Sequence, residues 1–110
     1  LLTSKTGDAG DTEGTPVSIL EAATVGLPIV TTVHAGIPEL LPADSARPMM
    51  LRPEGDVEGI ATALRALASD TALRREWGGA CRDFVRAAHS ASAHVEALLA
   101  ALERLAEAPR

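Results

Sequence analysis

Two carboxylates flank an expected helix start near the beginning of this 110-residue chain. Glu13 lies beside Gly14 in a turn, and Glu21 lies within the helix that follows. At a helix start the first backbone N–H groups have no intrahelical acceptor and the dipole favours negative charge, so a phosphate can bind there. Carboxylates accept hydrogen bonds from sugar hydroxyl groups. The combination indicates a site for a nucleotide sugar.

The residues of this candidate site also have ordinary structural roles as alternatives. Glu13 could be a solvated loop acid, and Ser18 could lie on a plain helix surface rather than contact a phosphate. Glu21 belongs to a helix of apolar character, where an unpaired carboxylate would be costly to bury; this favours a ligand or a partner for it. His34 is expected to be a loop residue near the site. Glu39 could be either a charge at a helix start or a ligand.

A short helix and a buried strand must position these residues. Thr15 is expected to be the N-cap and Pro16 the first helical residue, since proline tolerates a position whose N–H has no helical acceptor. Gly26 is typical of the residue that follows a helix C-terminus. The β-branched run from Pro28 to Val33 predicts a buried parallel strand. Two further strands are expected, at Leu1–Ser4 and at Met49–Arg52.

The second half of the chain is expected to be helical. Asp56 and Asp70 are N-cap candidates for two helices, and we expect the second helix to break at Gly78–Gly79. A further helix is expected over Ala80–His89. The final helix has two candidate caps and one apolar stripe that would normally pack: Ser90 and Ser92, then Val95, Leu98, Leu99, Leu102 and Leu105.

Composition argues against several kinds of protein. The net charge of −5 argues against nucleic-acid binding, which needs clustered basic side chains. The single cysteine, Cys81, excludes an internal disulfide and a cysteine-built zinc site, and we expect an inert buried thiol. His89 and His94 have no third ligand nearby, so no metal is expected. Trp77 and Phe84 are expected in the core.

The ends of the chain bear on location. No apolar run approaches the length of a membrane span, and the N-terminus lacks a signal-peptide pattern, so we expect a cytoplasmic location. Peripheral association with a membrane stays open for a longer parent protein.

The chain opens at Leu1 without an initiator Met, as if cut from a strand. We therefore expect a fragment of a longer protein.

The segment from Glu13 to Leu41 resembles the C-terminal domain of family-4 retaining glycosyltransferases, which have the GT-B fold. Their hallmark is two glutamates with seven residues between them, then Gly-Leu-Pro and a β-branched strand, as at Glu13, Glu21 and Gly26–Pro28. The likeness extends over about residues 8–89. Its later elements follow in the order of that family: Gly36–Glu39, Pro53–Asp56, Asp70–Arg75 with Trp77–Gly78, and Arg82.

The resemblance implies a role for each residue of the site. Glu13, the candidate catalytic residue, would bind hydroxyl groups of the donor sugar near the reacting carbon, and Glu21 would bind the ribose. That family needs no metal, because amides and basic side chains offset the charge of the departing diphosphate. The distal phosphate would face the backbone N–H groups around Gly14, Thr15 and Val17 at the helix start. Ser18 is a further candidate for a phosphate contact.

The chain also departs from the pattern of that family. Pro16 removes one possible phosphate-binding amide, and Ala46–Leu51 stands where the family usually has a glycine before its third strand. The basic pair that clamps the diphosphate, the base-binding loop and the N-terminal domain all lie upstream of the motif in that family. Lys5 does not match the basic pair. We therefore expect no turnover by the isolated chain.

These observations predict an α/β fold: the C-terminal half of a Rossmann-like GT-B domain, with a short parallel sheet of about three strands and a helical tail. Residues 1–90 would form a partial nucleotide-sugar-binding domain, and residues 91–110 a C-terminal helix. The parent would move a sugar from a nucleotide diphosphate to an acceptor hydroxyl with retention, in polysaccharide or glycolipid biosynthesis. Its partners would be the nucleotide sugar and the missing N-terminal domain.

Two other kinds of function stay open. The chain could be an inactive remnant or a non-catalytic interaction module, which no feature of the motif excludes. A non-hydrolysing sugar epimerase on the same fold agrees less well with the Glu13–Glu21 spacing and with the Gly-Leu-Pro element.

Overall fold

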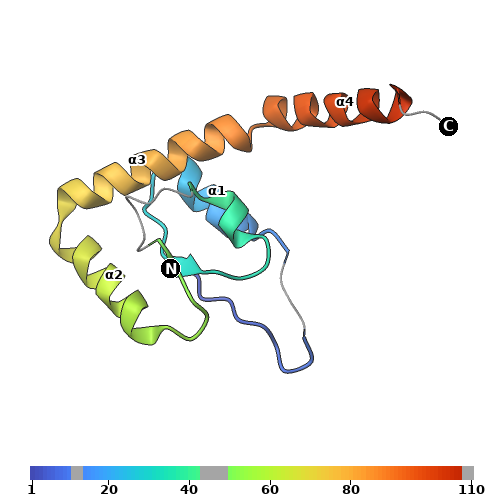
Figure 1. Cartoon of the computed structure of the whole chain (residues 1–110). Helices are drawn as coiled ribbons and strands as arrows, with labels where there is room; N and C mark the ends of the chain where they lie inside the picture. The colour runs from blue at the N-terminus through green and yellow to red at the C-terminus, as the bar shows by residue number, and fades with distance from the viewer. Residues whose placement is uncertain (11–13, 43–49, 108–110) are drawn as a thin grey trace.

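The computed structural model describes residues 1–10, 14–42 and 50–107. Figure 1 shows α1, α2 and α3 gathered around the short strands, with α4 projecting from the end of α3. The chain is elongated as a result, with extents of 57 × 37 × 23 Å. The elements follow in the order α1 (Val17–Thr24), β1 (Thr31–Thr32), the 3₁₀ helix η1 (Ile37–Leu40), β2 (Leu51–Arg52), α2 (Val57–Ser69), α3 (Thr71–Ala88) and α4 (Ala91–Glu107).

The sheet is smaller than predicted. β1 and β2 pair in parallel, with Thr31 opposite Leu51. The expected first strand is reduced to an isolated parallel bridge between Leu2 and Thr31. Beyond it, the carbonyl oxygen of Ser4 accepts a hydrogen bond from the side-chain hydroxyl of Thr32 at 2.6 Å, which is not a backbone ladder bond. The prediction of about three strands is therefore wrong for the described residues, which form two.

The predicted strand from Pro28 to Val33 is confirmed in position but is shorter in regular structure. Residues 29–32 are all buried, although only Thr31–Thr32 is paired as a strand. Continuous burial is typical of a strand that is covered on both faces. Met49, predicted to begin the last strand, lies outside the described residues. The remainder of that strand is present as β2.

Helix α1 begins one residue later than predicted and ends where expected. Pro16 is the N-cap, because its ψ of 113° is extended rather than helical. At the other end, Gly26 has a φ of 79°, which a residue with a side chain rarely adopts. Its N–H donates to Ala23 O at 2.9 Å, and the N–H of Leu27 donates to Ala22 O at 3.1 Å. This pair of hydrogen bonds is a Schellman motif, which satisfies the last carbonyl groups of the helix.

The predicted break at Gly78–Gly79 does not occur, and α3 runs without interruption from Thr71 to Ala88. A Cβ atom at residue 78 would collide with the backbone carbonyl of Gly26. Gly78 therefore lets α3 approach the C-terminal turn of α1 more closely than any side chain would allow. The usual preference against glycine in a helix, about 1 kcal/mol, is outweighed here by this contact.

The two aspartate caps are confirmed. Asp56 accepts a hydrogen bond from the N–H of Gly59 and Asp70 from that of Leu73, both at 2.9 Å. Each carboxylate satisfies one of the backbone donors that a helix start leaves without an intrahelical partner.

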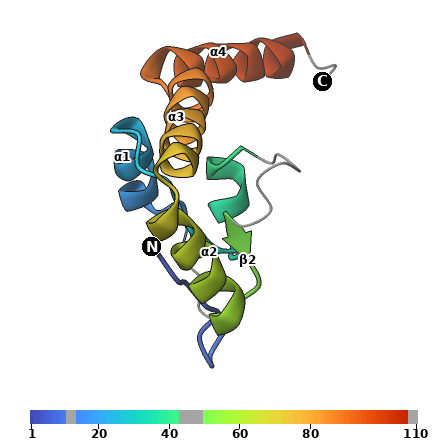
Figure 2. The ribbon, with the colours of Figure 1, turned by 90° about the vertical axis from the view of Figure 1, so that its left-hand side faces the viewer.

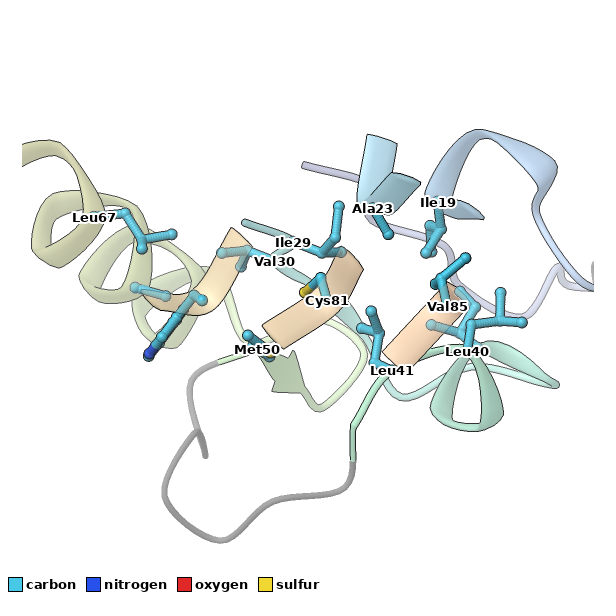
Figure 3. Close-up of a cluster of buried hydrophobic side chains, with 13 residues drawn as sticks. Ile19, Ala23, Ile29, Val30, Leu40, Leu41, Met50, Leu67, Cys81 and Val85 are labelled. Atoms are coloured by element: carbon cyan, nitrogen blue, oxygen red, sulfur yellow. The ribbon is translucent and has the colours of Figure 1, made fainter. Parts of the chain in front are cut away.

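One hydrophobic core joins α1, α2, α3 and the strands. Figure 3 shows Cys81 and Val85 of α3 among the buried side chains of α1 and the chain around β1. Trp77 and Cys81 are buried, as predicted, whereas Phe84 is half-buried against the core. The buried hydrophobic residues are Ile19, Ala23, Ile29, Val30, Ile37, Leu40, Leu41, Met50, Ala63, Leu67, Trp77, Cys81 and Val85.

Helix α4 contributes nothing to this core. Ser90 caps it, accepting a hydrogen bond from the N–H of Ala93 at 3.2 Å, so the first of the two candidate caps is confirmed. None of the residues described in the helix, 91–107, is buried. Figures 1 and 2 show the helix extending away from α1 and α2. The expected packing of the apolar stripe is therefore wrong within the described chain: Val95, Leu98, Leu99, Leu102 and Leu105 are 52–73% exposed.

Candidate functional site

The loops that follow the parallel strands meet at one edge of the sheet. In parallel α/β sheets, ligands bind outside the carboxyl ends of the strands. Here the loop after Leu2 passes through Thr6, the loop after β1 carries His34 and Gly36, and the turn after β2 carries Glu54. This edge is therefore the place to look for a ligand site.

Glu54 connects all three loops. Its Oε1 atom lies 2.6 Å from Nδ1 of His34 and 3.2 Å from the hydroxyl oxygen of Thr6. Its Oε2 atom accepts a hydrogen bond from the backbone N–H of Thr6 at 3.0 Å. The N–H of Thr6 is the main cause that lowers the pKa of Glu54, and the contact with His34 lowers this pKa further, against a smaller opposing effect of burial. The carboxylate is therefore held in its charged form.

The loop after β1 also reaches the start of α1. Ala35 adopts a φ of 45°, a left-handed conformation that is unfavourable for a residue with a Cβ atom. A Cβ atom at the next residue, Gly36, would lie 3.5 Å from Oγ1 of Thr15 and 3.9 Å from the carbonyl oxygen of Gly14. The loop therefore lies directly against the residues that precede α1.

The start of α1 is open to a ligand. Gly14, Thr15, Val17 and Ser18 are all exposed. The N-cap is Pro16. Its side chain has no hydrogen-bond acceptor, so it does not cap the first backbone N–H groups of the helix. The first turn of the described helix, residues 17–20, contains no acidic residue that would repel an anion. The structure thus brings four of the predicted site residues together at one exposed helix start.

The two glutamates of the motif have different outcomes. Glu13 lies outside the described residues, so its predicted role stays a prediction. Glu21 lies on α1 and is exposed. The premise that Glu21 lies at a buried position, from which the need for a ligand or partner was argued, is therefore wrong, because a helix of apolar composition still presents one face to water. The predicted ribose contact stays a prediction, and the exposed position leaves the carboxylate accessible.

The turn after β2 is fixed by a second carboxylate. Oδ2 of Asp56 lies 2.8 Å from Nε and 2.6 Å from Nη2 of Arg52, while Oδ1 caps α2. The hydrogen bond from the N–H of Gly59 is the main cause that lowers the pKa of Asp56, and Arg52 lowers it further. A Cβ atom at residue 59 would collide with both partners, which explains a glycine in the first turn of α2.

Sequence reasoning treated Glu54 only as part of a family-like turn and missed its contacts. The available signal was a histidine directly after one expected strand and a glutamate two residues after the next. Because parallel strands place their carboxyl ends at the same edge, such a pair can meet there.

Two hollows in the surface of the described chain have mainly apolar linings, and the smaller one includes Ser18 of the start of α1. The larger, of about 450 Å³, is lined by Leu1, Pro28, Val30, Leu64, Leu67, Ala68 and Arg74. The smaller, of about 290 Å³, is lined by Leu1, Leu2, Ser18, Ile19, Ala22 and Ile29. A small-molecule site combines an apolar lining with several convergent polar groups, whereas each of these linings has one polar side chain, Arg74 in the larger and Ser18 in the smaller.

Within the described residues, no group of three or more potential metal ligands occurs. None of the helices in the described ranges is long and apolar enough to cross a membrane.

Comparison with known proteins adds evidence from sequence. A family model described as "Glycosyl transferases group 1" matches residues 2–70. The putative colanic acid biosynthesis glycosyltransferase WcaL of Escherichia coli is 50% identical over 66 residues, which cover 60% of this chain and 16% of that protein. The amylovoran biosynthesis glycosyltransferase AmsK of Erwinia amylovora is 44% identical over 72 residues, covering 66% of this chain and 17% of that protein.

A plant protein shows the same region of similarity. The sulfoquinovosyl transferase SQD2 of Arabidopsis thaliana is 39% identical over 66 residues, which cover 59% of this chain and 13% of that protein. This chain thus spans between about an eighth and a sixth of the length of these relatives. No solved structure matches it significantly.

Proposed function

This chain belongs to the glycosyl transferases group 1 family, and we propose that it forms the donor-binding part of a retaining glycosyltransferase that acts in polysaccharide assembly. The observation that carries the proposal is the open start of α1. The residues just before it, Gly14 and Thr15, lie against Gly36 at the carboxyl edge of the sheet, and the first amides of the helix have no side-chain cap and no acid in the first turn. A diphosphate group satisfies such amides and interacts favourably with the helix dipole.

Each residue of the site then has a role in binding the donor. The N–H groups of Val17 and Ser18 face the distal phosphate, together with the backbone of Gly14 and Thr15. Glu21, one turn into the helix on an exposed position, accepts hydrogen bonds from the ribose hydroxyl groups.

Glu13 is assigned to hydroxyl groups of the donor sugar near the reacting carbon. In the reaction, the bond between that carbon and the diphosphate oxygen breaks while a bond to the acceptor hydroxyl oxygen forms. The acceptor proton leaves with the nucleoside diphosphate. We assign binding rather than turnover to these 110 residues, since the donor needs further cationic contacts to offset the charge of the diphosphate.

A polysaccharide product is supported by the relatives. WcaL and AmsK are named for the biosynthesis of colanic acid and amylovoran. The plant relative is named instead for the sulfoquinovosyl group that it transfers, and its name gives no acceptor. Glycolipid assembly is the alternative product class that we keep for this chain.

A different kind of function has one observation in its favour. The exposed apolar stripe of α4 is typical of a surface that binds another protein segment. An interaction module without catalytic activity would use this stripe and would not need the open start of α1.

Titration of the ¹⁵N-labelled chain with UDP-glucose and GDP-mannose, followed by NMR, separates these two functions. The donor-binding proposal expects binding that is millimolar at best, with chemical-shift changes confined to Gly14–Ser18 and Glu21. Glu21→Gln should weaken this binding, whereas Glu58→Gln, at an exposed carboxylate in the first turn of α2, should leave it unchanged. Shift changes distributed at random, or equal effects of the two variants, would refute the assignment of the site.

A further inference from the structure

One carboxylate holds together three loops that are far apart in the sequence. Glu54 is 48 residues from Thr6 and 20 from His34, yet it contacts both. Its two carboxylate oxygen atoms have different partners. Oε2 accepts a hydrogen bond from the backbone N–H of Thr6, and Oε1 lies within hydrogen-bonding distance of Nδ1 of His34. The loops after Leu2, β1 and β2 are therefore fixed relative to one another at the edge where a ligand is expected.

The two partners in this contact have different surroundings. The side chain of His34 is 1% exposed, whereas that of Glu54 is 33% exposed. A buried ring has few alternative orientations, so the contact fixes the direction in which the loop after β1 continues. The carboxylate remains accessible to solvent, which keeps it charged at neutral pH, in agreement with its lowered pKa.

The loop after β1 is anchored at both ends, and it contacts the residues just before α1. His34 anchors its beginning, and the fully buried side chain of Ile37 anchors its end. Between them Ala35 is kept in a left-handed conformation, which persists only when the surroundings determine it. Gly36 then lies against Thr15, immediately before the helix start.

We propose that Glu54 and His34 are positioning residues for the donor site, because their contact holds the loop that supports the residues before α1. They act through Gly36 on Thr15 and on the amides of Val17 and Ser18, and neither needs to touch the donor. The role in donor binding rests on the proposed function. The link from the Glu54–His34 contact through Gly36 to Thr15 exists without a ligand and can be tested without one.

The test uses the 110-residue chain and amide hydrogen exchange followed by NMR. In Glu54→Ala, exchange of the Thr6 amide should be faster by about three- to tenfold, the size expected when a partly exposed charge-assisted contact is lost. A similar increase is expected at two hydrogen-bonded amides along the proposed link: Ile37, which donates to the carbonyl of His34, and Ile19, which donates to the carbonyl of Pro16. Amides of the core, such as those of Leu67 and Cys81, should keep their wild-type rates. Glu58→Ala is the matched control and should change none of these rates.

Substitutions at His34 provide a rescue experiment. His34→Asn places an amide N–H close to the position of Nδ1, so it should retain most of the wild-type protection at Ile37 and Ile19. His34→Ala should resemble Glu54→Ala. Since a buried histidine can be required for folding, the Glu54 variants decide the question if His34→Ala does not fold.

Several results would overturn the proposal. Unchanged exchange at Ile19 in Glu54→Ala would show that the contact does not reach the helix start, even if exchange at Thr6 becomes faster. Equal acceleration across the core would show a contribution to global stability instead. A parallel titration with UDP and GDP reports on the proposed function separately: absence of binding to the wild-type chain would count against donor binding, while the exchange rates still decide the positioning role.

Discussion

The two ends of α1 differ in how their backbone groups are satisfied. At the C-terminal end, Gly26 and Leu27 close a Schellman motif, and Gly78 of α3 packs directly against the carbonyl of Gly26. At the N-terminal end, Pro16 offers no cap and the first residues are exposed. A short helix that is fixed firmly at one end can leave its other end available to a ligand. The starts of α2 and α3, each capped by an aspartate, show what a helix start looks like when its role is only structural.

The largest expected effect concerns the fixed end. Gly78→Ala should lower the free energy of unfolding by roughly 2–4 kcal/mol, because its Cβ atom would collide with the backbone of Gly26 and force α1 away from α3. Chemical denaturation measures this loss. Gly79→Ala is the matched control: a Cβ atom there would meet nothing closer than Nη2 of Arg82 at 4.0 Å, so the substitution should be neutral or stabilising by up to about 1 kcal/mol. Equal losses of stability in both variants would mean that the contact with Gly26 contributes nothing specific. The contrast between the two ends of α1 would then have no support from this test.

The next effect concerns a capped start. Asp70→Ala should reduce stability by about 1 kcal/mol, because the N–H of Leu73 loses its acceptor. Asp70→Asn should retain most of the stability, since asparagine caps a helix comparably well. Thermal unfolding of the three proteins checks this order. If Asp70→Ala is as stable as the wild-type chain, caps contribute too little to distinguish the helix starts.

Acid should affect the capped start of α2 and the Glu54 contact, but not the start of α1. The pKa values of Glu54 and Asp56 are lowered in the folded chain, so both carboxylates stabilise it above their ordinary pKa values, near 4.5 and 3.8. This contribution is lost as the pH falls through the lowered values. Thermal unfolding between pH 7 and pH 3 should show the loss, and Asp56→Asn should make it shallower. A melting temperature independent of pH would contradict the ionic contacts.

The smallest effect on stability tests the open start directly. Val17→Glu should stabilise the chain by a few tenths of a kcal/mol, because a negative charge in the first turn interacts favourably with the helix dipole. Val17 is 64% exposed, so little packing is lost. The same charge should repel a phosphate and weaken binding of UDP and GDP, whereas Val17→Gln should change neither property by much. Retained nucleotide binding in Val17→Glu, measured by NMR titration, would place the phosphate elsewhere.

Local sequence signals predicted the helix boundaries better than they predicted the tertiary contacts. Asp56, Asp70 and Ser90 were recognised as caps and Gly26 as the end of α1, because each acts on backbone groups within a few residues. The break predicted at Gly78–Gly79 was wrong for the opposite reason. Glycine in a helix can mark a break or a close approach, and the partner in this approach, Gly26, lies far away in the sequence.

The same distinction applies to the candidate site. The order of Gly14, Thr15, Val17 and Ser18 before and within a short helix predicted an anion site, and the structure places these residues together and exposed. Glu21 was expected to need a ligand or partner because a carboxylate is costly to bury in a helix of apolar character. It is exposed instead, because the face that a helical residue presents depends on what packs around the helix. The contact between Glu54 and His34 could not be read from either residue alone.

By itself the sequence determined the family, the aspartate caps of α2 and α3 and the glycine that ends α1, because these depend on neighbours in the chain and on an ordered motif. The donor-binding residues proposed at the start of α1 come from the same motif. Tertiary structure alone decided that the sheet has two strands in the described chain, that α3 continues without a break at Gly78–Gly79, and that the apolar stripe of α4 is exposed in the described chain. It also decided that one carboxylate joins three loops beside the helix start. Such features depend on which distant segments meet, and short-range patterns of side chains carry little information about that.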